Sequence, residues 1–278
     1  MRRLLAACAL VFGAARAQQP QNPSPMVEHT RAHLRLKEQS PPGRREGLDL
    51  GTLFIPAHTR PTTLLIFFHG GTWLPEVAAA RNRTAVVSVQ AGSGSGSYAH
   101  LFADESRFPA LLNEAQAKAG RRFTRVVVGG WSAGCGAVRE ILRAPAGYAR
   151  TSAIVVIDGI HTDYENGKSG PLESSLDTGN LGIWLQFFRD SIAGRKRAIV
   201  THSEIFPGTY ASTTETADYL VRELDLKPHA VLKWGPMGTQ QIGEVRKGKL
   251  LIMGFAGNSA PDHVDQLHSL PAYLRLLR

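Results

Sequence analysis

The chain has 278 residues, a formal net charge of +9, 43% hydrophobic residues and 20% charged residues. This length and composition are typical of a folded protein with one large core, and they exclude a disordered or collagen-like chain. The basic residues stand in short, scattered clusters. They therefore indicate a solvated surface, and no nucleic-acid partner is expected.

The first residues have the layout of a secretory signal peptide. Two arginines follow the first methionine, Leu4–Phe12 is a short apolar stretch, and Ala15-Arg-Ala17 offers a small-residue cleavage site. The apolar stretch is too short to span a bilayer, so we expect secretion to the periplasm or the medium without stable membrane insertion. Cleavage after Ala17 removes Cys8 and three arginines, which lowers the net charge from +9 to +6. Only Cys135 then remains, so no intramolecular disulfide is expected.

The mature chain begins with a segment, residues 18–47, that is rich in proline, glutamine and charge and is predicted to be flexible. Apolar runs then predict buried strands at 48–55, 63–68, 84–89, 125–130, 153–157, 197–201 and 249–253. Helices are predicted at 102–119, 137–143, 213–224 and 264–277. Pro109 stands near the first turns of the first of these or marks a restart, and Pro271 interrupts the last. This alternation predicts one α/β domain over residues 48–278, with a doubly wound, mostly parallel sheet and helices on both faces.

Two long intervals interrupt the alternation. Residues 161–196 contain an apolar and aromatic stretch at 181–188 and are interpreted either as an inserted lid or as a core helix with a loop. Trp184, Phe187 and Phe188 in this stretch are accordingly candidates for a hydrophobic cover or for core residues. Residues 227–248 are expected to carry an extra strand around 230–234.

One pattern in the chain is typical of a nucleophilic serine. Gly130, Ser132 and Gly134 form a G-x-S-x-G motif directly after a predicted strand, and a predicted helix follows. In this strand-turn-helix context the glycines permit a sharp turn that lifts the serine hydroxyl clear of the sheet. The context makes Ser132 a much stronger candidate than the five-residue motif would be by itself.

The motif order resembles that of the α/β-hydrolase family, in its serine esterase and lipase-like members. The resemblance covers roughly residues 48–278 and rests on His69-Gly-Gly71 after an apolar strand, the motif around Ser132, and a histidine after the last strand. It implies a catalytic triad in the chain order serine, acid, histidine. It also implies an oxyanion hole made by the N–H groups of Gly70 or Gly71 and of Ala133.

The resemblance narrows the choice of base and acid. His263 follows the last predicted strand and is the predicted base, with His268 as the alternative. Asp158 ends a buried strand and is preferred as the acid, while Glu204, just past the next strand, stays open. The minor candidates for the acid are Asp262 and Asp265.

Two tryptophans flank the predicted site. Trp73 and Trp131 are candidates for the apolar wall that binds substrate. The pairs His161-x-Asp163 and Asp262-His263 are weak metal motifs, because the usual ligand spacings are absent, so no metal and no cofactor are expected.

These features predict a secreted serine hydrolase that cleaves a small-molecule or polymeric carboxylic ester through an acyl-enzyme on Ser132. A serine peptidase or an acyltransferase on the same fold is an alternative, since the same groups serve amide cleavage and transfer to an alcohol. A third possibility is a noncatalytic binding protein that kept the fold. The sequence leaves the oligomeric state open.

Overall fold

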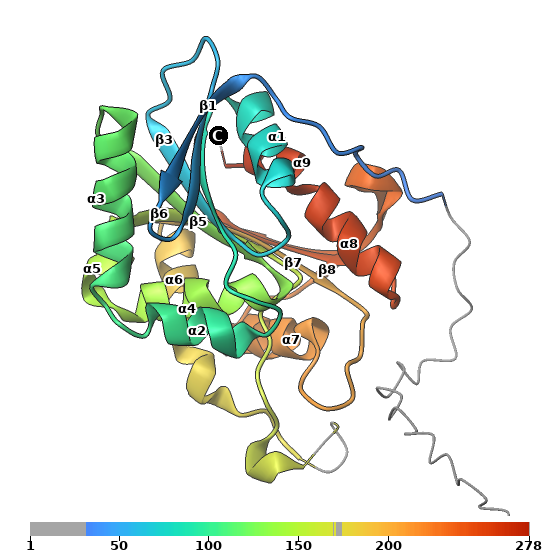
Figure 1. Cartoon of the computed structure of the whole chain (residues 1–278). Coiled ribbons are helices and arrows are strands. Elements are labelled where there is room, and N and C mark those ends of the chain that lie inside the picture. The colour runs from blue at the N-terminus through green and yellow to red at the C-terminus, as the bar shows by residue number, and fades with distance from the viewer. Residues whose placement is uncertain (1–31, 169, 171–173, 278) are drawn as a thin grey trace, which may run out of the picture.

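The computed structural model describes residues 32–168, 170 and 174–277. A ten-stranded sheet forms the centre of this part, in the order β1-β2-β4-β3-β5-β6-β7-β10-β9-β8. Figure 1 shows helices packed on both sides of the sheet. The predicted signal peptide at 1–17 and residues 18–31 of the predicted flexible segment lie outside the described residues.

The strands from β4 to β10 in this order are all parallel to their neighbours, whereas both edges of the sheet are antiparallel. The strands are β1 (Gly43–Leu48), β2 (Gly51–Pro56), β3 (Thr63–Phe68), β4 (Ala85–Val89), β5 (Arg125–Trp131), β6 (Thr151–Ile157), β7 (Arg197–Ser203), β8 (His229–Trp234), β9 (Gln240–Lys247) and β10 (Leu250–Phe255). The doubly wound, mostly parallel sheet predicted from the alternation is therefore confirmed.

Successive side chains of the central strands point into two separate cores. On β3, Leu64, Ile66 and Phe68 belong to one buried cluster, while Leu65 and Phe67 belong to the other. This alternation follows from the two-residue period of a strand. Because both faces are covered, the strand sequences read as continuous apolar runs rather than as alternating patterns.

The helices divide between these two cores. The first core is covered by α2 (Ser95–Phe102), α3 (Arg107–Ala119), α4 (Cys135–Arg143), α5 (Pro145–Arg150), α6 (Gly182–Ile192) and α7 (Thr213–Glu223). The second is covered by α1 (Trp73–Asn82), α8 (Ala260–His268) and α9 (Leu270–Arg275). Helices on both faces were expected, and this expectation is confirmed.

The N-terminal part of the domain differs from the prediction. The single strand expected at 48–55 is a hairpin of β1 and β2, whose turn ends at Gly51 with a φ of 105°. Strand β1 thus lies within the segment predicted to be flexible. Its residues are mostly exposed at the edge of the sheet, so it carries no apolar run that would announce a strand.

Two predicted helices are each divided, and one strand was not predicted. The predicted helix 102–119 is divided between α2 and α3, where Asp104 accepts hydrogen bonds from the N–H and hydroxyl of Ser106, and Pro109 stands in the first turn of α3. The interruption predicted at Pro271 is present, because Pro271 fits only the first turn of a new helix, α9. The expected strand near 230–234 is present as the edge strand β8, and its neighbour β9 was missed.

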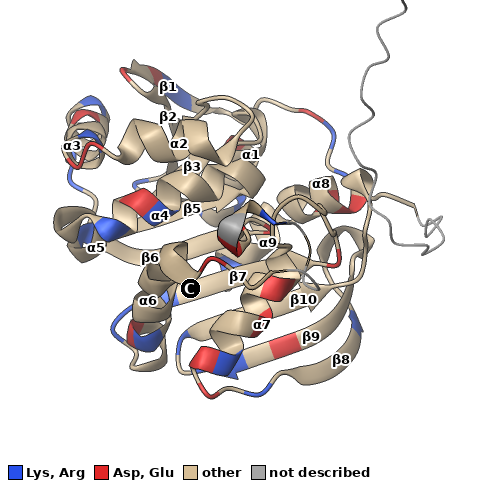
Figure 2. Cartoon of the chain, turned by 90° about the horizontal axis from the view of Figure 1, so that it is seen from below, with Lys and Arg blue, Asp and Glu red and all other residues tan. Residues whose placement is uncertain are grey.

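The charged residues do not gather on one side of the molecule. Figure 2 shows Lys and Arg interspersed with Asp and Glu on α3, α6 and the edge strands. Within residues 32–168, 170 and 174–277, no helix combines the length and apolar character needed to cross a membrane.

Candidate active site

Ser132 stands at a tight turn between β5 and α4. Its φ of 51° lies in the left-handed region, which is uncommon for a residue with a β-carbon. The flanking glycines make the turn possible: a β-carbon on Gly134 would collide with the carbonyl oxygen of Phe68, and one on Gly130 would lie 2.8 Å from the backbone of Gly134. This backbone has the form of a nucleophile elbow, and it places the serine at the carboxyl end of a buried strand.

The His69-Gly-Gly71 turn lies beside this elbow, because β3 pairs with β5 so that Phe68 is opposite Gly130. Gly70 and Gly71 have φ values of 93° and 82°. Within the described part of the chain, their N–H groups donate to no other protein group. The turn therefore presents backbone N–H donors next to Ser132, at the carboxyl ends of the central strands β3 and β5.

Asp158 and His263 form a direct pair across the end of the sheet. Asp158 follows β6 and is 3% exposed, and its Oδ2 lies 2.6 Å from Nδ1 of His263 in the first turn of α8. An ionised carboxylate can only accept a hydrogen bond. The pair therefore places the ring proton on Nδ1 and leaves Nε2 as the acceptor.

The carboxylate of Asp158 receives several neutral donors besides His263. Oδ1 accepts from the N–H of Ser203 at 3.0 Å and from the hydroxyl of Thr213 at 2.7 Å, while Oδ2 also accepts from the hydroxyl of Ser203 at 2.7 Å. Burial alone would raise the pKa of Asp158, but the bonds from His263, Thr213 and Ser203 outweigh it and hold the pKa below its usual value. Asp158 therefore stays ionised at neutral pH.

The backbone of His263 is also held in place. The indole N–H of Trp131 donates to the carbonyl oxygen of His263 at 3.0 Å, and the two rings lie 4.5 Å apart. The other face of Trp131 stacks on His69 at 5.1 Å. Burial, and then the nearby charge of His263, lower the pKa of His69, so His69 is a neutral support for this stack. The tryptophan thus links the serine turn to the histidine helix.

Ser132, Asp158 and His263 all line one cavity of about 770 Å³. Within the described residues, Ser132 and His263 make no direct hydrogen bond with each other. The serine, the imidazole and the carboxylate thus line the same cavity.

The walls of this cavity come from segments that the sequence did not single out. After β7, the loop of residues 204–212 contributes Ile205, Phe206, Pro207 and Tyr210. His161 faces Tyr210 with the ring centres 5.4 Å apart. Ile205-Phe-Pro207 is an apolar stretch that directly follows strand β7. Ligands bind at the carboxyl ends of strands in open α/β sheets, so this position in the sequence could have indicated a cavity wall.

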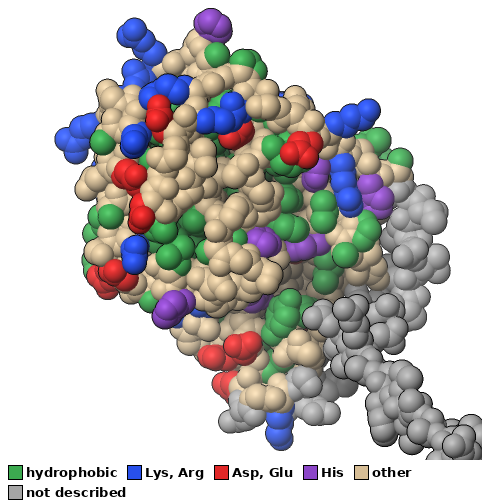
Figure 3. Space-filling view, in the orientation of Figure 1, with side chains coloured by type: hydrophobic (Ala, Val, Ile, Leu, Met, Phe, Trp, Pro, Cys, Tyr) green, Lys and Arg blue, Asp and Glu red, His purple; other side chains and the backbone are tan. Residues whose placement is uncertain are grey.

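The aromatic residues predicted to surround the site have other positions. Trp73 and Trp131 are half-buried and do not line the cavity; Trp73 packs edge-on against His268. The predicted cover residues are at most 2% exposed and form core contacts on α6, namely Trp184, Phe187 and Phe188. In this part of 161–196 the chain is a helix whose apolar side chains are buried. Figure 3 shows histidine and hydrophobic side chains together on one face of the molecule.

The alternative acids and base are bonded elsewhere. Exposed Glu204 pairs through its backbone and carboxylate with Gly257, in the loop before α8. His268 accepts a hydrogen bond from the N–H of Leu36. Asp262 accepts from Ser259 and caps α8, and Asp265 binds His33 and Arg35. The geometry thus brings Asp158, and not Glu204, to the ring of His263.

Cys135 lies just after the serine turn but has no place in this constellation. It is 2% exposed, and burial raises the pKa of its thiol. Its sulfur contacts the carbonyl oxygen of Gly130. A buried neutral thiol is a packing group and not a second nucleophile.

No model of a known protein family matches the chain, and no curated protein matches it either. Solved structures do resemble it. An acetyl xylan esterase from Aspergillus awamori is 14% identical over 80% of this chain and 93% of its own, with a TM-score of 0.46. An arylesterase is 12% identical over 87% of this chain and 86% of its own, with a TM-score of 0.48.

A third similar structure is the poly(3-hydroxybutyrate) depolymerase LpqC from Bordetella parapertussis, 14% identical over 81% of this chain and 88% of its own, with a TM-score of 0.47. At these identities and scores the likeness supports no conclusion about this chain. The mostly parallel strand order, the antiparallel β2 and the sharp turn at Ser132 are features of the chain itself, and they agree with the α/β-hydrolase resemblance of its motif order.

Proposed function

We propose that the protein is a serine hydrolase that cleaves carboxylic esters through an acyl-enzyme on Ser132. The observation that carries this proposal is the pair of Asp158 and His263 at 2.6 Å, in a cavity that Ser132 also lines. A serine hydroxyl is a weak nucleophile unless a base near neutral pKa takes its proton. A histidine held in one tautomer by a buried carboxylate is such a base.

In this mechanism Nε2 of His263 removes the proton of Ser132 as the hydroxyl oxygen attacks the ester carbonyl. Asp158 stabilises the imidazolium that forms but keeps its own charge. The N–H groups of Gly70 or Gly71, with that of Ala133, donate to the oxyanion. His263 then protonates the leaving alcohol. Afterwards it removes a proton from the water that attacks the acyl-enzyme, which releases the acid and restores the serine.

The cavity favours an uncharged ester with an apolar or ring-bearing group. Its wall offers Ile205, Phe206 and Tyr210 as apolar surface, with Asn258 as a polar contact. Lysine and arginine are absent from the described residues that line it, so a substrate carboxylate or phosphate would find no cation there. A volume of about 770 Å³ admits a ligand of moderate size.

Pre-steady-state ester hydrolysis with substrate in excess tests the proposal. Wild-type protein should release p-nitrophenol from p-nitrophenyl acetate or benzoate in a burst of one equivalent, and intact-mass spectrometry should find the acyl group on Ser132. The control is Ser132→Ala, which keeps the fold and should lose both the burst and the adduct. Turnover without any adduct on Ser132 would reject the acyl-enzyme.

The alternatives give different results in the same experiment. A serine peptidase would cleave matched peptide anilides at rates comparable with those of the esters. An acyltransferase would give more transfer product than acid when an alcohol is added. A noncatalytic binding protein would remain unlabelled while folded. Preference for the ester with water as acceptor is the outcome expected from the present proposal.

We also propose that the protein is exported and cleaved after Ala17, in keeping with the layout of residues 1–17. N-terminal sequencing of protein recovered outside the cytoplasm should begin at Gln18. Recovery of uncleaved chain in the cytoplasm alone would contradict this.

A further inference from the structure

Helix α8 carries His263, so its position determines where the imidazole lies. Two residues further along this helix is Asp265, whose side chain is 0% exposed. A fully buried carboxylate is stable as an anion only when it is paired and hydrogen-bonded. The partners of Asp265 therefore bear directly on where α8 can rest.

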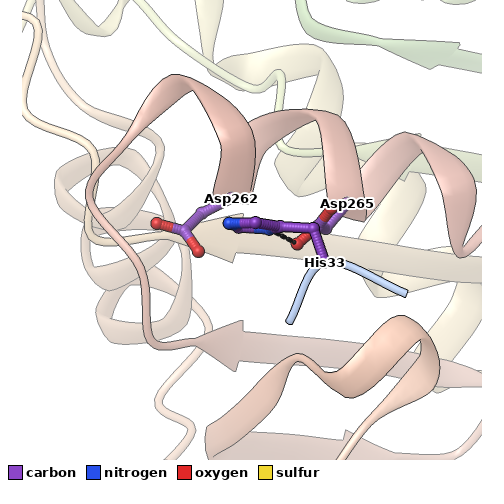
Figure 4. A group of neighbouring side chains, drawn as sticks. All are labelled: His33, Asp262 and Asp265. Atoms are coloured by element: carbon purple, nitrogen blue, oxygen red, sulfur yellow. Dashed lines mark hydrogen bonds and ion pairs between the residues drawn. The ribbon is translucent and has the colours of Figure 1, made fainter. Parts of the chain in front are cut away.

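These partners come from the opposite end of the sequence. Nε of Arg35 donates to Oδ1 of Asp265 at 2.8 Å, and Nδ1 of His33 lies 2.6 Å from Oδ2. Figure 4 shows the His33 ring beside Asp265, with Asp262 on its other side. Figure 1 shows the blue N-terminal segment running past α9 and α8. Residues 33–36, which we call the strap, are thus bonded to the helix across more than 200 positions of sequence.

The strap also bonds the backbone and a second side chain of α8. Nη2 of Arg35 donates to the carbonyl oxygen of Pro261 at 2.9 Å, and the N–H of Leu36 donates to Nδ1 of His268 at 3.1 Å. Arg35 therefore contacts the helix both before and after His263. The contacts extend from the first turn of α8 to its last residue, so the strap restrains the helix along its whole length.

On the opposite side α8 is held by the serine turn. Trp131 donates to the carbonyl oxygen of His263, and a β-carbon on Gly70 would lie 2.6 Å from the side chain of Leu267. Helix α8 therefore lies between two sets of contacts, the strap on one side and the Trp131 and Gly70 turns on the other. Loss of one set frees the helix to shift relative to Ser132.

Ligand atoms of His33, Asp262 and Asp265 lie within 4.8 Å of one another, which raises the alternative of a metal site. In the structure, other groups already bind these two carboxylates. Arg35 already brings a fixed positive charge to Asp265, and Asp262 is used by the hydroxyl and N–H of Ser259 as the cap of α8. The guanidinium of Arg35 thus provides the positive charge that a bound metal ion would otherwise provide.

We propose that the strap fixes α8 and that Asp265, held by Arg35 and His33, is a positioning residue for His263. The inference rests on the proposed function for its catalytic consequence. In this proposal no strap residue enters the cavity, because the strap acts only by fixing the position of α8. A shift of about 1 Å between reacting groups can cost 10²-fold in rate, so a modest movement of α8 is sufficient.

The experiment compares Arg35→Ala with a matched control, Arg45→Ala. Both arginines are about one-third exposed and each binds a buried carboxylate, Asp265 and Glu76 respectively. Both variants should lose some thermal stability. We expect kcat to fall about tenfold or more only in Arg35→Ala, with KM within about twofold, because the apolar wall formed by residues 205–210 is untouched. Arg35→Lys keeps the charge without the two-point contact and should recover part of the rate.

Hydrogen–deuterium exchange gives a second readout that does not depend on activity. Exchange in residues 260–268 should rise in Arg35→Ala and stay unchanged in Arg45→Ala. Equal losses of kcat in the two variants at equal stability, or unchanged exchange in α8, would overturn the proposal. Wild-type protein with no ester turnover, yet with the expected exchange pattern, would reject the proposed function while supporting the hold of the strap on α8.

Asp265→Asn guards against a folding failure of the arginine variant. The amide keeps the shape of the side chain but not the charge, so it should weaken the strap and lower kcat in the same direction. Zinc or EDTA should leave exchange in α8 of the wild type unchanged. Slower exchange with zinc that disappears in His33→Ala would instead identify a metal site and overturn the strap as the source of order.

Discussion

Two buried aspartates near His263 have almost the same immediate geometry and different consequences. Asp158 and Asp265 are 3% and 0% exposed, and each has an oxygen 2.6 Å from Nδ1 of a histidine. Asp158 is otherwise surrounded by neutral donors and borders the cavity with Ser132. Asp265 has a guanidinium beside it and lies outside the cavity lining.

The difference lies in what balances each carboxylate. Neutral donors hold Asp158 in place and leave its charge to be balanced by an imidazolium, which is the species that the proposed mechanism forms when His263 takes a proton. Arg35 balances Asp265 with a permanent positive charge, and His33 is not among the residues that line the cavity. Under the proposed function, the two Asp–His pairs thus differ in the third partner of the aspartate and in the space that the histidine faces.

The largest effect is expected from Asp158→Asn. The amide keeps the shape but loses the charge and favours the wrong tautomer of His263, so kcat should fall by about 10⁴-fold. Steady-state hydrolysis of p-nitrophenyl acetate measures this, with circular dichroism as the control for folding. A loss below about tenfold would show that Asp158 is not the acid, and would undo the distinction between the two aspartates.

Asp265→Asn should lower the stability of the fold more than it lowers kcat, in contrast to Asp158→Asn. Removing one member of a buried ion pair typically costs about 3 kcal/mol, so the free energy of unfolding should fall by about this amount. The loss in kcat should stay near tenfold, far below that of Asp158→Asn. Urea denaturation and steady-state kinetics measure the two quantities. A larger kinetic loss than in Asp158→Asn would reverse the assignment.

Acid should weaken the fold through Asp158. Its pKa in the folded protein lies below the usual value, so its contribution to stability is complete above the pKa of the unfolded chain, about 3.9. The contribution is lost as the pH falls through the lower folded pKa. The free energy of unfolding of the wild type should therefore drop more steeply below about pH 4 than that of Asp158→Asn. Parallel curves would contradict this.

Changes in the cavity wall should affect binding more than chemistry. Tyr210 is 41% exposed and faces His161, but it touches neither Asp158 nor His263 in a hydrogen bond. We expect Tyr210→Ala to raise KM for a benzoate ester about three- to tenfold with little change in kcat, since it removes contacts common to ground and transition states. Tyr210→Phe should stay near the wild type if only the ring matters.

The smallest effect is expected from Glu204→Ala. Its exposed carboxylate contacts the N–H of Gly257 at 3.4 Å, and exposed interactions of this kind contribute little. Turnover should remain within about twofold of the wild type. A loss of orders of magnitude would make Glu204 the acid and leave the bond between Asp158 and His263 without its proposed role.

The sequence predicted the parts of this fold that depend on continuous local patterns. The apolar runs of β3 and β6 and the glycines around Ser132 are such patterns, because a strand buried on both faces and a sharp turn each restrict composition. The edge strand β1 was misplaced and the second strand from the other edge, β9, was missed, since their polar residues resemble loops.

The site shows the same division. Ser132 and His263 stand at positions that chain order marks, and they face one cavity. The choice between Asp158 and Glu204 depends on which carboxylate reaches the imidazole, a distance that no local pattern contains. The strap was beyond prediction for the same reason, because Arg35 and Asp265 come together only through the tertiary fold.

The most direct test of the central claim is covalent labelling of Ser132 by a fluorophosphonate probe, followed by peptide mapping. Wild-type protein should carry one label, on Ser132, and the rate of labelling should fall by orders of magnitude in Asp158→Asn but only slightly in Glu204→Ala. Folded wild-type protein that takes no label, or takes it on another residue, would contradict the serine hydrolase assignment.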